Sequence, residues 1–169
     1  APAPLGLDEV ISRCADHLPD QDQQELEDLL SAPPGGDTPF AKDWAVTWQL
    51  LQHRNHRERS SRLPGTPTPA APSGLPDPDS QLHHDLDTAW AESDPLKRET
   101  ALLRAEWNWI DARRRLSPYS FDDLAGFVLQ VQLLERKDRW EQDAGHTQFE
   151  THVRSFMEPV HEHLQETPA

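Results

Sequence analysis

The sequence predicts an all-α fold, a single multi-helix bundle of about six or seven helices within residues 1–169. Apolar residues recur at three- and four-residue spacings along most of the chain, and no segment shows sustained two-residue alternation. Six tryptophans and five phenylalanines supply core-forming side chains, although only 35% of the residues are hydrophobic. The composition therefore predicts a folded core under a polar surface.

Two short helices are predicted at the start of the chain. The first spans residues 8–18, and the second spans residues 20–30, where Asp20 or Asp22 is available to cap the N-terminus. A break at residues 32–37 holds two prolines and two glycines and separates these helices from the next segment.

A longer helix is predicted to begin at Thr38, because Pro39 at the first helical position is typical of a helix start. One helix face carries Phe40, Trp44, Trp48 and Leu51, and the polar Asn55 continues it. Six prolines between Leu63 and Pro78 then exclude helix and central strand alike. Residues 64–78 are therefore predicted to form a mobile, polyproline-like connector inside the domain.

Two helices are predicted between the connector and Pro118. The first is short, with an apolar face of Leu82, Leu86, Ala89 and Trp90. The second opens at Ser93-Asp94-Pro95, with an apolar face of Leu96, Thr100, Leu103, Trp107 and Ile110.

The helix predicted over 121–143 is apolar most of the way round, so we expect it to be the central, most buried element. Ser120 with Asp123 resembles a capping box at its start, with Asp in place of the usual Glu. A last helix is predicted over 149–160.

Charge and cysteine content exclude several classes of function. Thirty acidic residues against 16 Lys and Arg give a net charge of −14, which argues against nucleic acid as the main partner. No apolar run approaches the roughly 20 residues that span a bilayer. The one cysteine, Cys14, excludes an internal disulfide framework and is predicted to be a buried, inert thiol.

No catalytic motif stands out, and we predict neither an enzyme nor a cofactor. The histidines leave one alternative open, a metal-binding module or small metal-dependent enzyme. His53 and His56 share a helix face, but His161 and His163 are two residues apart and point to different faces. Solvated surface histidines are the preferred interpretation, because a zinc site needs three or four converging ligands.

Polar residues within apolar faces are the first set of candidate site residues. They are Arg54, Asn55, Gln132, Glu135 and Arg136. One interpretation is an internal network, in which Glu135 pairs with Arg54 or Arg104 and fixes how the helices pack. The alternative is that Arg136 lies at a groove that receives a carboxylate of a partner protein.

Four residues near Ile110 complete the set: Trp107, Trp109, Arg113 and Arg114. Trp107 falls on the apolar stripe, which favours core packing, whereas Trp109 points elsewhere and faces either a neighbouring helix or a partner. The arginines are predicted to be the solvated end of a helix, with docking of an acidic partner surface as the alternative.

Several short motifs together resemble an uncharacterised bacterial family whose members are encoded beside V-type ATPase subunits. They are Glu106–Asp111 (EWNWID), Tyr119–Leu124 (YSFDDL), Gln130–Arg136 (QVQLLER), Gly145, Arg54-Asn55 with Arg59 and Arg62, and Asp94-Pro95-Leu96 before Glu99. The likeness extends from about Asp8 to Phe149.

The resemblance implies a helical accessory protein or subunit that binds V-type ATPase components and has no chemistry of its own. It implies a role like that of the subunit coupling the rotor stalk to the membrane ring. The expected location is cytoplasmic, with peripheral attachment to the inner membrane through the ATPase. A third hypothesis is a regulatory module whose Pro-rich segment is bound by another domain.

Overall fold

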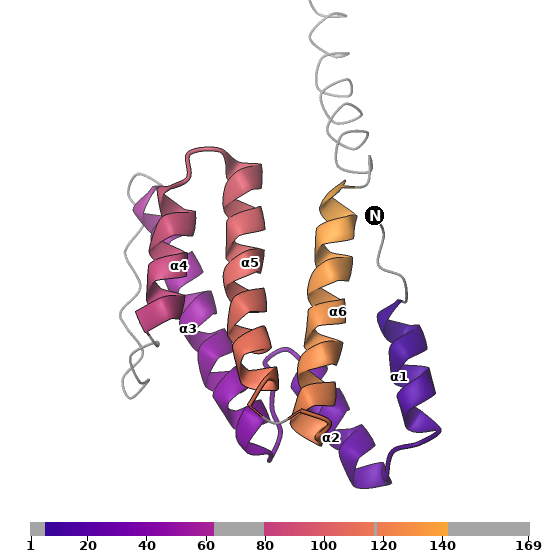
Figure 1. Cartoon of the computed structure of the whole chain (residues 1–169). Helices are drawn as coiled ribbons and strands as arrows, with labels where there is room; N and C mark the ends of the chain where they lie inside the picture. The colour runs from indigo at the N-terminus through magenta and orange to yellow at the C-terminus, as the bar shows by residue number, and fades with distance from the viewer. Residues whose placement is uncertain (1–5, 63–79, 117, 142–169) are drawn as a thin grey trace, which may run out of the picture.

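The computed structural model describes residues 6–62, 80–116 and 118–141, and this part of the chain is all-helical, without strands (Figure 1). Its helices are α1 (Leu7–Ala15), α2 (Asp20–Leu30), α3 (Pro39–Ser61), α4 (Ser80–Ala91), α5 (Pro95–Arg114) and α6 (Phe121–Glu141). The all-α prediction is confirmed. The predicted connector over 64–78 and the predicted helix over 149–160 lie outside the described residues.

The helices pack side by side, with α5 and α6 in the middle. Helix α5 contacts α4 on one side and α6 on the other, and α6 also contacts α1 and α2. In Figure 1, α3 runs behind α4 and α5. None of the described helices is long and apolar enough to span a membrane.

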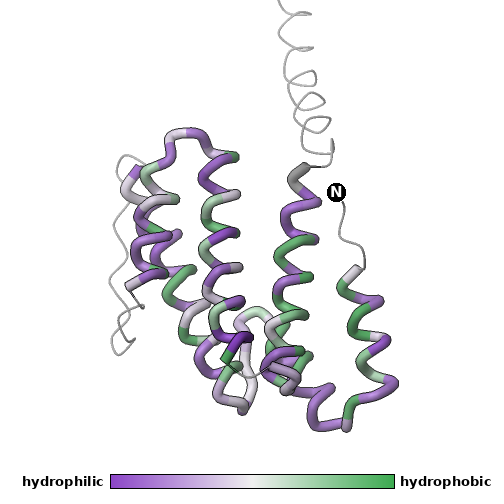
Figure 2. Tube along the Cα trace, in the orientation of Figure 1, coloured by the Kyte–Doolittle hydropathy of each residue, from purple (hydrophilic) through white to green (hydrophobic). Residues whose placement is uncertain are grey.

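The core is formed by one face of each helix. Figure 2 shows hydrophobic and hydrophilic residues interspersed along the helices, as expected for helices that bury one face. Val128 and Leu129 of α6 are among the most completely buried side chains, together with Leu29 of α2 and Ile110 of α5. The prediction that the helix beginning at Phe121 is a central element therefore agrees with its contacts to three other helices.

Local capping chemistry explains where the longer helices begin. The Thr38 side chain accepts a hydrogen bond from the Ala41 N–H, and Pro39 occupies the first turn of α3. The Asp94 carboxylate likewise accepts from the N–H groups of Leu96 and Lys97 at the start of α5. Both starts are where the sequence predicts them.

The corner between α2 and α3 is held by the Glu25 carboxylate. Its oxygens accept hydrogen bonds from the N–H groups of Asp37 and Thr38 at 2.7–2.9 Å. Burial alone would raise the pKa of Glu25, but these hydrogen bonds lower it below its ordinary value. Gly36 lies directly against this carboxylate with φ of +126°, a conformation that favours glycine.

Candidate functional site

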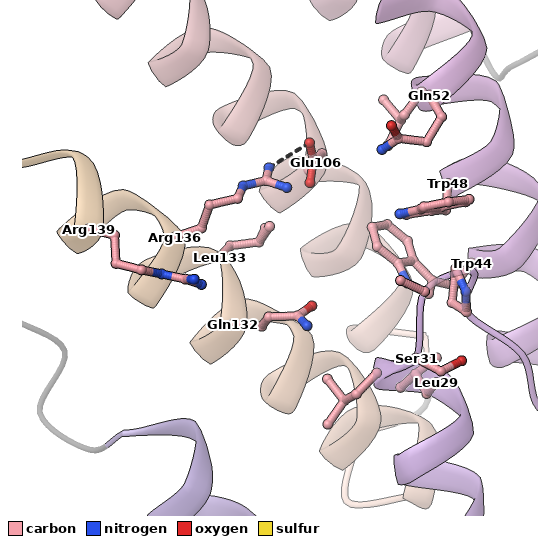
Figure 3. Close-up of a pocket in the computed structure, with 14 residues that line it drawn as sticks. Leu29, Ser31, Trp44, Trp48, Gln52, Glu106, Gln132, Leu133, Arg136 and Arg139 are labelled. Carbon is pink, nitrogen blue, oxygen red and sulfur yellow. Dashed lines mark hydrogen bonds and ion pairs between the residues drawn. The ribbon is translucent and has the colours of Figure 1, made fainter. Parts of the chain in front are cut away.

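A partly enclosed cavity of about 190 Å³ lies between the α2–α3 segment and helices α5 and α6 (Figure 3). Its inner wall consists of buried residues: Leu29, Pro34, Trp44, Leu51, Glu106 and Leu133. Exposed residues form its mouth: Ser31, Ala32, Gln52 and Arg139. Apolar and polar groups contribute to its lining in about equal measure, and a cavity in which apolar side chains meet convergent polar groups can bind a small ligand.

Glu106 on α5 is a buried charged group on the inner wall, only 7% exposed. Its Oε1 accepts a hydrogen bond from Nη2 of Arg136 on α6 at 2.7 Å. Burial raises the pKa of Glu106 above its ordinary value, and the positive charge of Arg136 offsets only part of that rise. Glu106 therefore depends on Arg136 for compensation of its charge.

Glu106 is absent from the site residues that the sequence predicts. It lies four residues after Leu102 and four before Ile110, and all three side chains are buried on one face of α5. The sequence signal that could have identified Glu106 is a carboxylate flanked by apolar residues four positions before and four positions after it, which places all three on one helix face.

Two predicted residues of α6 line the cavity, and a third does not. Gln132 and Arg136 both line it, and Figure 3 shows Gln132 turned toward the space between α6 and α3. Glu135 instead accepts a hydrogen bond from the Leu7 N–H at 2.6 Å, which caps the start of α1. The predicted pairing of Glu135 with Arg54 or Arg104 is therefore wrong, because Glu135 lies on the side of α6 that contacts α1.

Replacing Glu135 with alanine is expected to loosen α1, because the Gly6 N-cap of this helix has no side chain that could accept in its place. The loss of a charged cap costs about 1–2 kcal/mol. Amide hydrogen exchange over residues 7–15 should accelerate by about tenfold, while exchange in α5 changes little. Glu135→Gln keeps an acceptor and is the matched control. Equal exchange rates in wild type and Glu135→Ala would show that α1 does not depend on this contact.

Arg54 and Asn55 lie outside the cavity, toward the end of α3. Arg54 joins α3 to α4 through its Nη2, which lies 2.7 Å from Oδ1 of Asp87, and its Nε lies 3.0 Å from Oε1 of Glu58. The Asn55 Oδ1 is buried and accepts no hydrogen bond from the described part of the chain. The predicted polar network thus divides into separate contacts rather than one cluster.

Trp109 is more deeply buried than Trp107, although the predicted apolar stripe favours Trp107 for the core. Trp109 is in the core, with its ring centroid 5.6 Å from that of Trp44 and 6.3 Å from that of Phe40. It therefore faces a neighbouring helix, α3, which was one of its two predicted alternatives. Trp107 is half-buried and lines an open groove between α5 and α6 together with Leu103.

Arg113 and Arg114 pack on the protein instead of extending into solvent as predicted. The Arg113 guanidinium lies over the Trp109 ring at 4.2 Å from the centroid. Arg114 joins α5 to α6, since its Nε donates to Oδ1 of Asp123 at 2.8 Å and its Nη1 donates to the Gln130 side chain. Only the Arg114 head group is held by α6, whereas Arg113 lies between Trp109 of its own helix and Asp43 of α3.

Neither the histidines nor Cys14 forms a site within the described residues. No group of three or more His, Cys, Asp or Glu side chains there could hold a metal ion. His161 and His163 lie outside the described residues. Cys14 is half-buried, and burial raises the pKa of its thiol, which disfavours the reactive thiolate.

Comparison with known proteins finds no match to a family model, to a curated protein or to a solved structure. The resemblance to the V-type ATPase-associated family therefore stays a prediction from the sequence motifs.

Proposed function

We propose that this chain is a non-catalytic helical docking protein that binds its partner through the end of the molecule where α5 turns into α6. The observation that carries the proposal is the position of the exposed large hydrophobic side chains. Of the four in the described residues, Leu116, Tyr119 and Phe127 lie within one short stretch of chain, and Leu96 lies at the other end of α5. A cluster of exposed apolar side chains is typical of an interaction surface.

The three side chains, Leu116, Tyr119 and Phe127, are here named the end surface. Phe127 and Tyr119 border a shallow hollow of about 530 Å³, whose apolar floor includes Leu18 and Phe121. Tyr119 is fully exposed and has φ of 62°, an uncommon conformation for a residue other than glycine. The backbone strain at Tyr119 does not bury its side chain, so it is not explained by packing. We take the exposure of an aromatic ring at a strained position as support for a binding role.

The charge around the end surface favours a partner with basic side chains. Asp22, Asp123 and Arg114 line the hollow, and Arg114 pairs with Asp123 at 2.8 Å. Asp22, together with Asp122 next to Asp123 in the sequence, leaves the surface with an excess of negative charge. Burial and the charge of Glu25 raise the pKa of Asp122, as expected where carboxylates gather. A partner segment with an apolar face and flanking Lys or Arg would complement this surface.

The identity of the partner is supported by the sequence resemblance alone, which implies a V-type ATPase subunit. On that ground we propose attachment to this ATPase, in a role like that of the subunit coupling the rotor stalk to the membrane ring. Two of the motifs that carry the resemblance, Tyr119–Leu124 and Gln130–Arg136, lie on or beside the end surface and along α6.

Replacing Leu116 and Tyr119 with serine is expected to weaken binding strongly without unfolding the protein, because both side chains are exposed. Affinity capture of the tagged full chain from native lysate, with quantification of V-type ATPase subunits by mass spectrometry, measures the effect. Recovery of these subunits should fall by about tenfold or more, as for loss of an aromatic anchor at an interface. Leu96→Ser is the matched control, since Leu96 is 61% exposed at the opposite end of α5.

Equal recovery with the double variant and the control would overturn the end surface as the docking site. Absence of ATPase subunits from the wild-type capture would overturn the proposed partner, whatever other proteins are recovered.

A further inference from the structure

We propose that the cavity between α3, α5 and α6 binds a small carboxylate that carries one apolar ring, a group about the size of phenylacetate. The cavity shares no lining residue with the end surface, so this proposal stands apart from the docking function. It rests on the size of the cavity, its aromatic wall and the signs of the charges around it.

The size of the cavity fits one ring. Its volume is about 190 Å³. A protein cavity of about 150 Å³ accommodates benzene, so a ring with a short acidic arm fits here. Trp44, Trp48 and Leu51 line one side, and Figure 3 shows the Trp48 ring turned toward the space. Aromatic side chains favour offset or edge contacts with another ring.

The charges favour an anion over a cation. The charged groups that line the cavity are Glu106, Arg136 and Arg139. Glu106 already accepts from Arg136 at 2.7 Å, so a cation would have to displace Arg136 from a buried carboxylate. An anion leaves that pair intact and meets the guanidinium of Arg139 at the mouth. Guanidinium groups present several N–H donors in a plane that matches a carboxylate.

Neutral donors complete the expected recognition. Gln52 on α3 and Gln132 on α6 both line the cavity, and Figure 3 shows their amides directed toward the space between the two helices. An amide N–H from each side can bond a carboxylate oxygen that sits between Arg136 and Arg139. The same chemistry is offered by a free aromatic acid and by the C-terminal Phe of a peptide.

The binding test uses indole N–H signals of the full-length protein in heteronuclear NMR, with phenylacetate as the probe. Saturable shifts are expected for Trp44 and Trp48, which line the cavity, and not for Trp90, which lies on α4. Trp48→Phe assigns one of the affected signals. Phenylacetamide and phenethylamine have the same ring without the negative charge and should bind about tenfold more weakly.

Two peptides distinguish the sources of the ligand. Gly-Gly-Phe with a free carboxylate and the same peptide as its C-terminal amide are titrated in the same way. Tighter binding of the free peptide than of phenylacetate assigns the cavity to a peptide C-terminus. The reverse order assigns it to a small aromatic acid.

Arg139→Gln is expected to weaken phenylacetate binding by about tenfold, because the lost contact is charge-assisted. Arg104→Gln is the matched control, since Arg104 is exposed, changes the net charge equally and does not line the cavity. Gln132→Phe fills the cavity and should abolish binding, and its circular dichroism verifies the fold. The proposal is overturned if the acid, amide and amine bind alike, if no shift saturates, or if Arg139→Gln and Arg104→Gln bind equally.

Discussion

Replacing Gly36 with alanine is expected to lower the free energy of unfolding by about 2–4 kcal/mol, from backbone strain together with overpacking. Gly36 has φ of +126°, and a Cβ there would lie 2.5 Å from Oε1 of Glu25 and 2.6 Å from Cβ of Ala41. The Glu25 carboxylate cannot move aside without releasing the N–H groups of Asp37 and Thr38. The steric clash and the loss of hydrogen bonds therefore both destabilise the segment that connects α2 to α3.

Gly35→Ala is the matched control for this prediction. The nearest atom to a Cβ at Gly35 is the Asp28 carbonyl oxygen at 4.0 Å, so alanine fits without a clash. Its stability should equal that of wild type or rise by about 0.5 kcal/mol, because alanine restricts the unfolded chain. Urea unfolding followed by far-UV circular dichroism measures both variants. Equal losses for the two glycines would refute a special role of Gly36.

Helix positions were predictable because the chemistry that starts a helix is local. Thr38 followed by proline and Asp94 followed by proline each cap a helix in the structure as the sequence indicates. The start of α6 also follows the predicted pairing of Ser120 with Asp123. The Asp123 N–H donates to Ser120 Oγ as in a capping box, and the Asp123 carboxylate accepts a hydrogen bond from the Tyr119 N–H.

The buried face of α5 was predicted only in part. Leu103 and Ile110 of the predicted stripe are buried, but Leu96 is largely exposed. The observed buried face also includes Leu102 and Glu106, which the predicted stripe left out. A prediction from apolar periodicity does not assign a helix face that contains a glutamate to the core, because burying a charge is unfavourable when it has no partner. That partner, Arg136, lies 30 residues away in the sequence and reaches α5 only through the fold.

The partners of the polar residues depend on tertiary structure for the same reason. Glu135 contacts Leu7 across 128 residues of sequence, and no spacing rule places α1 beside α6. Residue type shows that a polar group inside an apolar helix needs a partner. Which partner it meets follows from the order in which the helices pack.

Replacing Arg136 with methionine is expected to destabilise the protein by about 3 kcal/mol at neutral to alkaline pH, because it leaves Glu106 buried without compensation. The value lies at the low end for buried pairs, since the Arg136 side chain is itself 39% exposed. The double variant Glu106→Leu with Arg136→Met removes both charges and should recover most of the loss. Urea unfolding of the single and double variants gives the coupling between the two residues.

The pH dependence of this loss identifies Glu106 as its cause. The pKa of Glu106 is raised in the folded protein, so above its ordinary pKa the unfolded chain loses a proton that the folded protein retains. Stability from this group is therefore fully present below the unfolded pKa and is lost as pH rises through the folded pKa. Removing Arg136 raises the folded pKa further, so the penalty of Arg136→Met should be larger at about pH 8 than at about pH 5. A glutamine at position 106 does not titrate, so the double variant Glu106→Gln with Arg136→Met should show no such difference between the two pH values. A penalty that is the same at both would mean that a group other than Glu106 is responsible.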